Sequence, residues 1–103
     1  MLTKKTDWNI SLDEFIAKNR FKGFAWGSWD CCKFANACIK AMTGKDLIPK
    51  ELKWKTEAEA MRSIKEYGKT LSKSIAKACK EKGVMQVDKA FIQKGDLVVY
   101  KEE

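Results

Sequence analysis

The stretch 24–38 constrains the fold most strongly, because two tryptophans, a glycine and an aspartate precede three cysteines within fifteen residues. Asp30 is a preferred helix N-cap, and apolar residues recur at helical spacing from Cys31 to Met42 until Gly44 supplies a stop. The pattern predicts a buried helix that begins at Cys31. Free backbone N–H groups and the helix dipole favour a thiolate at such a position, so Cys31 is the candidate nucleophile.

Four short segments resemble a known family, in the same order along the chain: Phe24–Gly27, Asp30–Ala35, Thr43–Asp46 and Lys94–Val99. They look like the small phage and prophage proteins related to the NlpC/P60 cysteine peptidases. In that family an Asp-Cys-Ser-Gly-Phe motif places the nucleophilic cysteine at a helix N-terminus. By this resemblance Cys31 takes the nucleophile position, Cys32 that of the serine and Lys33 that of the glycine.

The chain departs from the family in one chemically important respect. The peptidases use a histidine as the general base, and this sequence contains no histidine. A cysteine nucleophile needs a base or a cationic neighbour, and lysine and carboxylate groups match this task poorly near neutral pH. We therefore expect a non-catalytic binding protein encoded by a phage or mobile element. The resemblance implies a tail-assembly role; an inhibitor of a bacterial defence complex, such as an anti-CRISPR, fits size and charge equally well. The alternative is a thiol hydrolase with Cys31 as nucleophile.

Length and cysteine usage limit the remaining possibilities. A chain of 103 residues with 45% hydrophobic content supports one domain, residues 1–103, of which 1–10 read as an irregular N-terminal arm. The sequence shows no signal peptide and no apolar run long enough for a bilayer, which favours the bacterial cytoplasm over a membrane. The four cysteines show no paired C-x-x-C spacing, so we expect neither a metal nor another cofactor.

The positive charge comes almost entirely from lysine. Of the 21 basic residues only Arg20 and Arg62 are arginines, and the net charge is +7. Because bidentate reading of bases is mainly the work of arginine, sequence-specific nucleic-acid binding is disfavoured. Four lysines lie on one face of a predicted helix: Lys69, Lys73, Lys77 and Lys80. This row is either a solvated helix face or a surface for an acidic partner, which we expect to be a bacterial or phage protein or a nucleoprotein complex.

Aromatic residues cluster ahead of the cysteine helix: Phe21, Phe24, Trp26 and Trp29. They either line a binding groove or cover the core on both sides of the helix, and aromatics in small domains usually serve burial. Trp26 and Trp29 are the binding candidates of this group.

The predicted fold is α+β and mostly helical, with about four helices around the central cysteine helix and a small C-terminal β element. Capping boxes at Ser11–Glu14 and Thr56–Glu59 predict two helix starts, the second helix turning Ala60, Met61 and Ile64 inward. A further helix is predicted over 70–82.

The β element would consist of segments 84–87 and 97–100, of which Leu97–Tyr100 has the stronger strand pattern. Two strands leave unpaired edges, and main-chain donors and acceptors at an edge need partners. We therefore expect Leu97–Tyr100 to pair with a second copy of the chain in a homodimer, or with a partner protein.

Overall fold

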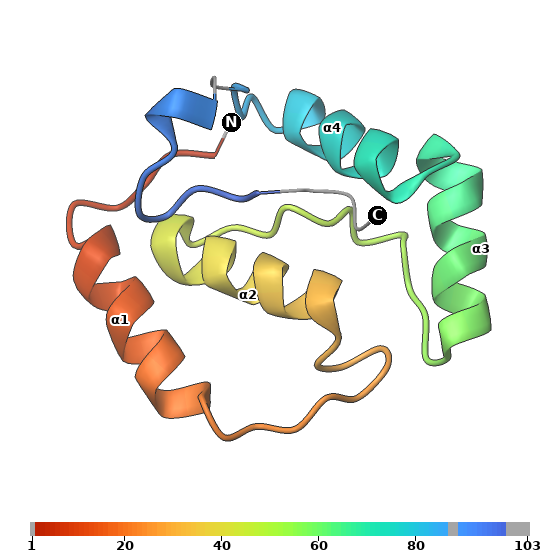
Figure 1. Cartoon of the computed structure of the whole chain (residues 1–103), viewed down its shortest axis with the longest axis horizontal. Helices are drawn as coiled ribbons and strands as arrows, with labels where there is room; N and C mark the ends of the chain where they lie inside the picture. The colour runs from red at the N-terminus through yellow and green to blue at the C-terminus, as the bar shows by residue number, and fades with distance from the viewer. Residues whose placement is uncertain (1, 87–88, 99–103) are drawn as a thin grey trace.

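The computed structural model describes residues 2–86 and 89–98. The described part contains four α-helices and one short 3₁₀ helix: α1 (Trp8–Asn19), α2 (Cys31–Thr43), α3 (Glu57–Gly68), α4 (Leu71–Glu81) and η1 (Lys89–Phe91). Helix α2 lies in the middle, flanked by α1, α3 and α4 (Figure 1). Helix α1 packs on α2 and α3 packs on α4. The chain is thus a compact, mostly helical domain around the cysteine helix.

Both predicted ends of α2 are confirmed. Asp30 is extended, with φ −88° and ψ 178°, and its Oδ1 accepts a hydrogen bond from the N–H of Lys33 at 2.9 Å. Gly44 takes the left-handed conformation at φ 80° and donates its N–H to the carbonyl oxygen of Lys40 at 2.7 Å. These two caps satisfy backbone groups that the helix itself leaves free, so they fix its length.

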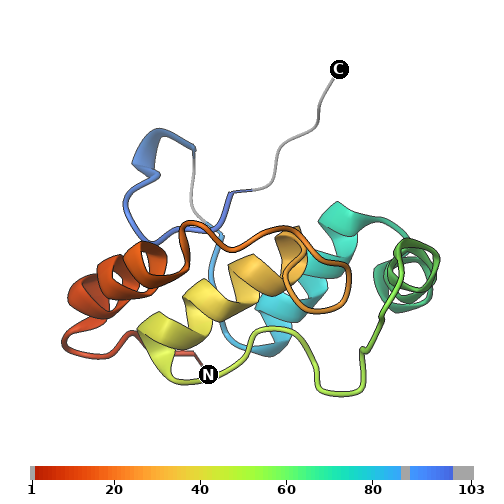
Figure 2. The same ribbon diagram turned by 90° about the horizontal axis from the view of Figure 1, so that it is seen from below.

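Helices α3 and α4 begin at threonine caps. The side chains of Thr56 and Thr70 accept hydrogen bonds from the N–H groups of Glu59 and Lys73, at 3.2 and 3.1 Å. The turn between the helices is tight, because a Cβ on Gly68 would lie 2.6 Å from the Cα of Ser74. Figure 2, turned by 90°, shows α3 nearly end-on, so the two helices cross steeply.

One side-chain direction in α3 was predicted wrongly. Ala60 is buried, as expected, but 52% of Met61 is exposed. Among the described helices α3 packs only on α4, and Met61 lies on a side of α3 that is partly open to solvent. Met61 therefore does not reach the core, although its position in α3 fits the apolar spacing of a helix.

The start of α1 also differs from the sequence-based prediction. Trp8 is the first helical residue, and the N–H of Ser11 donates to the carbonyl oxygen of Asp7 as in a helix interior. Ser11 is therefore not the N-cap, and residues 8–10 of the predicted irregular arm are helical. Tertiary contact explains the difference: the Lys4 Nζ lies 4.1 Å from the centroid of the Trp8 ring, and a Cβ on Gly95 would lie 2.9 Å from that ring.

The rest of the arm is held by backbone hydrogen bonds. The N–H of Leu2 donates to the carbonyl oxygen of Lys82, and the N–H of Lys5 donates to that of Met42, both at 2.8 Å. The arm thus connects the ends of α4 and α2 and bonds to the buried residue Met42.

The small C-terminal β element is not found. Within the described residues, 84–86 and 96–98 are irregular, and β pairing is limited to one isolated antiparallel bridge between Ala25 and Trp29. A turn at residues 93–96 precedes the segment 96–98. The side chain of Asp96 accepts a hydrogen bond from the N–H of Gln93, and the N–H of Asp96 donates to the carbonyl oxygen of Gln93. The other residues of the two predicted strands, Val87 and 99–100, lie outside the described residues. In the described part of the chain, no helix is long and apolar enough to cross a membrane.

Candidate functional site

The N-terminus of α2 is organised by a buried carboxylate. Only 2% of Asp30 is exposed, yet its oxygens accept hydrogen bonds from three groups. The N–H of Lys33 binds Oδ1 at 2.9 Å, whereas the N–H of Gly27 and the indole Nε1 of Trp54 bind Oδ2 at 2.9 and 2.7 Å. Asp30 therefore joins three parts of the chain: the preceding loop, the helix, and the segment that follows the helix.

These contacts keep Asp30 ionised. Burial acts to raise the pKa of its carboxyl group, but the hydrogen bonds from Lys33, Trp54 and Gly27 and the charge of Lys33 outweigh burial and lower the pKa. A carboxylate with a lowered pKa and three bound donors is a poor proton acceptor. Its role is to hold the helix N-terminus in place.

The two adjacent cysteines differ in environment. Cys31 is exposed, whereas Cys32 is half-buried and lines an apolar cavity. Burial raises the pKa of Cys32 to about 12, with further contributions from the charge and hydrogen bond of Cys31 and the charge of Asp30. Burial also raises the pKa values of Cys38 and Cys79. Cys31 is thus the thiol that solvent and reagents reach most readily.

The groups around Cys31 do not form a catalytic dyad. The sequence contains no histidine, and Asp30 is occupied by its three donors. The Nζ of Lys33 lies 4.5 Å from the centroid of the Trp54 ring, in a cation–π contact that holds the cation over the ring. Asp30 and Lys33 therefore each have contact partners other than the thiol of Cys31.

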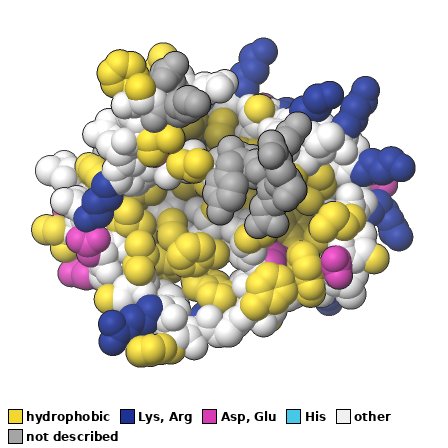
Figure 3. All heavy atoms as spheres, in the orientation of Figure 1, with side chains coloured by type: hydrophobic (Ala, Val, Ile, Leu, Met, Phe, Trp, Pro, Cys, Tyr) yellow, Lys and Arg dark blue, Asp and Glu magenta, His cyan; other side chains and the backbone are white. Residues whose placement is uncertain are grey.

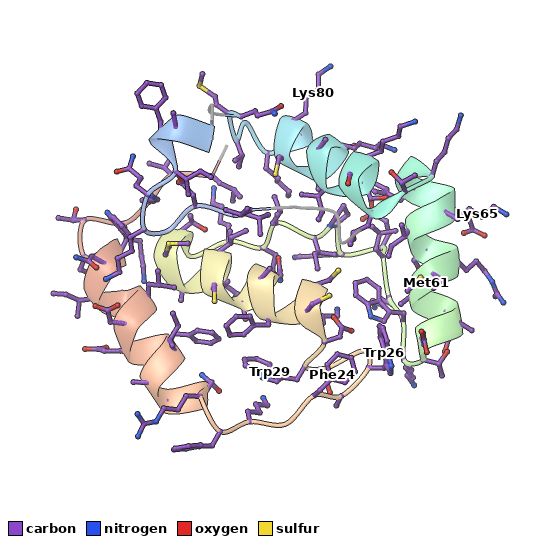
Figure 4. The ribbon with its side chains drawn as sticks, in the orientation of Figure 1. Phe24, Trp26, Trp29, Met61, Lys65 and Lys80 are labelled. Carbon is purple, nitrogen blue, oxygen red and sulfur yellow. The ribbon has the colours of Figure 1, made fainter. Side chains whose placement is uncertain are left out.

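Five aromatic side chains lie along residues 21–34, before and within the first turn of α2: Phe21, Phe24, Trp26, Trp29 and Phe34. We refer to them as the aromatic surface. Its three phenylalanines are 87%, 63% and 39% exposed, in that order, and both tryptophans are half-buried. Hydrophobic side chains gather over this part of the molecule in Figure 3, and Figure 4 shows Trp29, Phe24 and Trp26 in a row below α2. The aromatic side chains are therefore only partly covered by the rest of the described chain.

The rings of this surface contact one another and nearby cations. Phe24 and Trp26 meet edge to face at 5.1 Å, and Trp29 lies between Phe15 and Phe34, with ring centroids 6.0 and 5.6 Å away. Cationic groups of Lys22 and Arg20 lie over Trp29 and Phe21, at 4.2 and 4.7 Å from the ring centroids. The result is an apolar surface with positive charge at its margin.

The predicted lysine row is a separate feature. All four side chains are exposed, on or just before α4. The Nζ of Lys77 donates a hydrogen bond to the carbonyl oxygen of Tyr67 at 3.1 Å and lies over the aromatic ring of the same residue. Basic side chains gather at the upper right of Figure 3, and in Figure 4 Lys80 lies far from Trp26. The structure does not bring the row and the aromatic surface into one site.

Sequence reasoning missed the part played by residues 46–54. This segment runs back along α2, because the Oδ1 of Asn36 accepts from the N–H groups of Leu47 and Ile48 at 2.7 and 2.9 Å. Trp54 then reaches Asp30 at its end. In the sequence Pro49 lies between Leu47 and Leu52 and Trp54 follows, and nothing in this pattern indicates which groups the segment contacts.

Comparison with protein families gives one result. Residues 3–103 match the family described as Domain of unknown function (DUF6950). The chain belongs to this family. Comparison with curated proteins and with solved structures gives no match. Because the family's description names no activity, the case for a function rests on the residues described above.

Proposed function

We propose that this member of the DUF6950 family is a non-catalytic, NlpC/P60-like binding protein of phage or mobile-element origin that acts in the bacterial cytoplasm. The observation that carries this proposal is the aromatic surface beside a helix N-terminus whose carboxylate is already occupied. The scaffold presents exposed rings in the segment that leads to the exposed thiol of Cys31. The aromatic surface is the proposed binding site.

The energetics favour a protein partner for this surface. Full burial of a phenylalanine side chain stabilises a complex by roughly 1.5–3 kcal/mol relative to exposure, and Phe21 and Phe24 have most of that area to lose. Aromatic residues and arginine are enriched among the residues that dominate protein interfaces, and Arg20 lies over Phe21. Positive charge at the margin favours an acidic partner surface.

Two partner classes follow from the resemblance and from size and charge: a phage tail-assembly protein, or a bacterial defence complex that the protein inhibits. Both use the same surface in this proposal. The row formed by Lys69, Lys73, Lys77 and Lys80 would contribute long-range attraction to an acidic protein or nucleoprotein complex. We also propose that Leu97–Tyr100 forms the small C-terminal β element by pairing with a second copy.

The experiment is capture followed by cross-linking. The tagged protein and a Phe21→Ser/Phe24→Ser variant are incubated with lysate from phage-infected bacteria, and partners are identified by mass spectrometry. Ile10→Ser is the matched control, because Ile10 is 60% exposed on α1 and lies outside the aromatic surface. We expect the wild type and the Ile10→Ser control to capture the same partner, with cross-links near residues 21–34. The Phe21→Ser/Phe24→Ser variant should no longer capture this partner. Retention of that partner by the double variant contradicts the proposal.

A thiol hydrolase remains the second candidate, because Cys31 is exposed at the capped N-terminus of α2. Its test is turnover of peptide and thioester substrates by the wild type and by Cys31→Ala. Turnover that disappears in Cys31→Ala would establish this candidate, whereas equal background rates would remove it.

A further inference from the structure

An apolar cavity and a basic cleft adjoin each other along the segment between α2 and α3. The cavity has a volume of about 90 Å³ and lies among α2, α3, α4 and residues 47–54. The cleft, of about 350 Å³, is formed by α2 and residues 46–53. The two share four lining residues: Asn36, Ile48, Pro49 and Leu52. The cavity and the cleft are therefore adjacent, with these four residues between them.

The cavity suits an apolar group, because its polar neighbours already have partners. The amide of Asn36 accepts from two backbone N–H groups and donates to Asp46, and the hydroxyl of Ser74 donates to the carbonyl oxygen of Ile64 at 3.0 Å. Within the described part, no buried side-chain nitrogen or oxygen lacks a partner. A polar group that entered the cavity would lose its hydrogen bonds to water without replacement.

The volume sets the size of that apolar group. An engineered apolar cavity of about 150 Å³ stays dry and holds benzene. A cavity of about 90 Å³ suits a smaller group, of the size of a branched aliphatic side chain. A long acyl chain is too large for it.

The cleft suits an anion. Lys33, Lys50 and Lys53 line it. The ion pairs in the described ranges, Lys40–Asp46 and Lys94–Asp13, involve none of these three, although the Nζ of Lys33 lies over the Trp54 ring. Asp46 is the carboxylate of the cleft, and it is held by Lys40 and by Asn36. The three amino groups therefore favour a carboxylate-rich ligand.

We propose that this paired site binds an acidic segment of a partner protein, which inserts one leucine, isoleucine or valine side chain into the cavity. Carboxylates on either side of that anchor bind the amino groups of Lys33, Lys50 and Lys53. This inference rests on the proposed binding function and adds the chemistry of the partner. It concerns a site distinct from the aromatic surface.

The probe is a fluorescently labelled peptide in which aspartate and glutamate residues flank one central leucine. Its affinity for the intact protein is measured by fluorescence anisotropy at low salt, beside two altered peptides. Replacing the leucine by serine should weaken binding at least about tenfold, because the cavity contact is lost. Replacing the acids by their amides should weaken binding further as the attraction to the lysines disappears.

A matched pair of variants tests the cleft. Lys50→Gln/Lys53→Gln removes two exposed lysines of the cleft and should lower the affinity for the leucine peptide about three- to tenfold. Lys18→Gln/Lys65→Gln removes the same charge from exposed positions on α1 and α3, outside the cleft, and should leave affinity within about twofold.

Equal affinity for the leucine and serine peptides would overturn the proposal, and so would equal weakening by the two lysine pairs. Dodecanoate is the competing ligand: if it binds at the cleft and the leucine peptide does not, the occupant is an acyl chain and the proposal fails. The peptide assay uses purified protein without lysate. If the peptide assay fails, the capture experiment can still support binding through the aromatic surface. If the capture experiment fails, the peptide assay can still support the paired site.

Discussion

The indole Nε1 of Trp54 donates a hydrogen bond to the Oδ2 of Asp30 over 2.7 Å, across 24 positions of sequence. Gly27 donates its N–H to the same oxygen. A single buried carboxylate thus caps α2, closes the loop before it and fixes the segment after it. This carboxylate thus links the segment before α2, which carries Trp26 and Trp29, to the segment after α2, which lines the cleft.

Asp30→Ala should therefore cost more than the loss of an ordinary helix cap. An N-cap contributes roughly 0.5–2 kcal/mol, and this substitution also leaves the donors of Gly27 and Trp54 without an acceptor, at about 1–3 kcal/mol for a buried group. We expect the free energy of unfolding, measured with urea, to fall by about 2–4 kcal/mol. Thr70→Ala is the control, because Thr70 caps only α4 and is exposed. Equal losses from the two variants would mean that the contacts of Asp30 to Gly27 and Trp54 contribute little.

The same carboxylate should make stability depend on acid pH. Its pKa is lowered from 3.8 in the folded protein, because hydrogen bonds from Lys33, Trp54 and Gly27 outweigh the opposing effect of burial. The stabilisation is therefore complete above about pH 4 and is lost as the pH falls through the lower folded-state pKa. Urea unfolding at a series of pH values should show a steeper loss for the wild type than for Asp30→Asn. Parallel curves would contradict the assignment.

Local rules predicted this site only in part. The cap at Asp30, the stop at Gly44 and the helix between them follow from residue types at short spacing, so the sequence was sufficient for them. The bond to Trp54 depends on where a loop returns, and short-range patterns do not encode that return. The early start of α1 also depends on contacts that short-range patterns do not encode. The capping box at Ser11 predicted a later start, but Trp8 is already helical and contacts Lys4 and Gly95.

Gly27 and Gly44 form a matched pair for a test of loop packing. Both have φ near +80°, where an alanine costs roughly 1–2 kcal/mol. A Cβ on Gly44 would meet nothing within 4 Å, whereas one on Gly27 would lie 2.3 Å from the carbonyl oxygen of Trp54. Gly27→Ala should therefore destabilise the protein by clearly more than Gly44→Ala, and the difference in urea unfolding measures the overlap. If both cost the same, the loop does not pack on Trp54 as described.

The thiols should react in order of exposure. At neutral pH iodoacetamide should modify Cys31 first, because the pKa values of Cys32, Cys38 and Cys79 are raised by burial and these side chains are less accessible. Peptide mass spectrometry over time gives the four rates, and unfolding in urea should make them similar. Equal, slow modification of all four in the folded protein would rule out a reactive thiol. Cys32, whose pKa is about 12, should gain reactivity only at strongly alkaline pH.

The aromatics and the C-terminal segment show where burial could not be read from residue type. A cluster of aromatic residues in a small domain predicted side chains that cover the core, yet Phe21 and Phe24 are mostly exposed, whereas Trp29 packs between Phe15 and Phe34. An apolar, β-branched segment predicted a strand, yet residues 96–98 are irregular. A strand requires a neighbour to bond with, and an isolated chain offers this segment none among the described residues.

This need for a neighbour leads to the last prediction, which concerns Val98. Its side chain is 47% exposed and does not line the apolar cavity, whereas the side chain of the neighbouring Leu97 does. Val98→Pro removes a main-chain hydrogen-bond donor and fixes φ. If residues 97–100 pair with a second copy, both effects weaken the β-ladder between the two copies. Sedimentation analysis should show a dimer for the wild type and a monomer for Val98→Pro, whereas Val98→Thr, which keeps the N–H and a β-branched side chain, should remain dimeric. A monomer in all three proteins would refute self-pairing and leave strand addition to a partner as the remaining use of this segment.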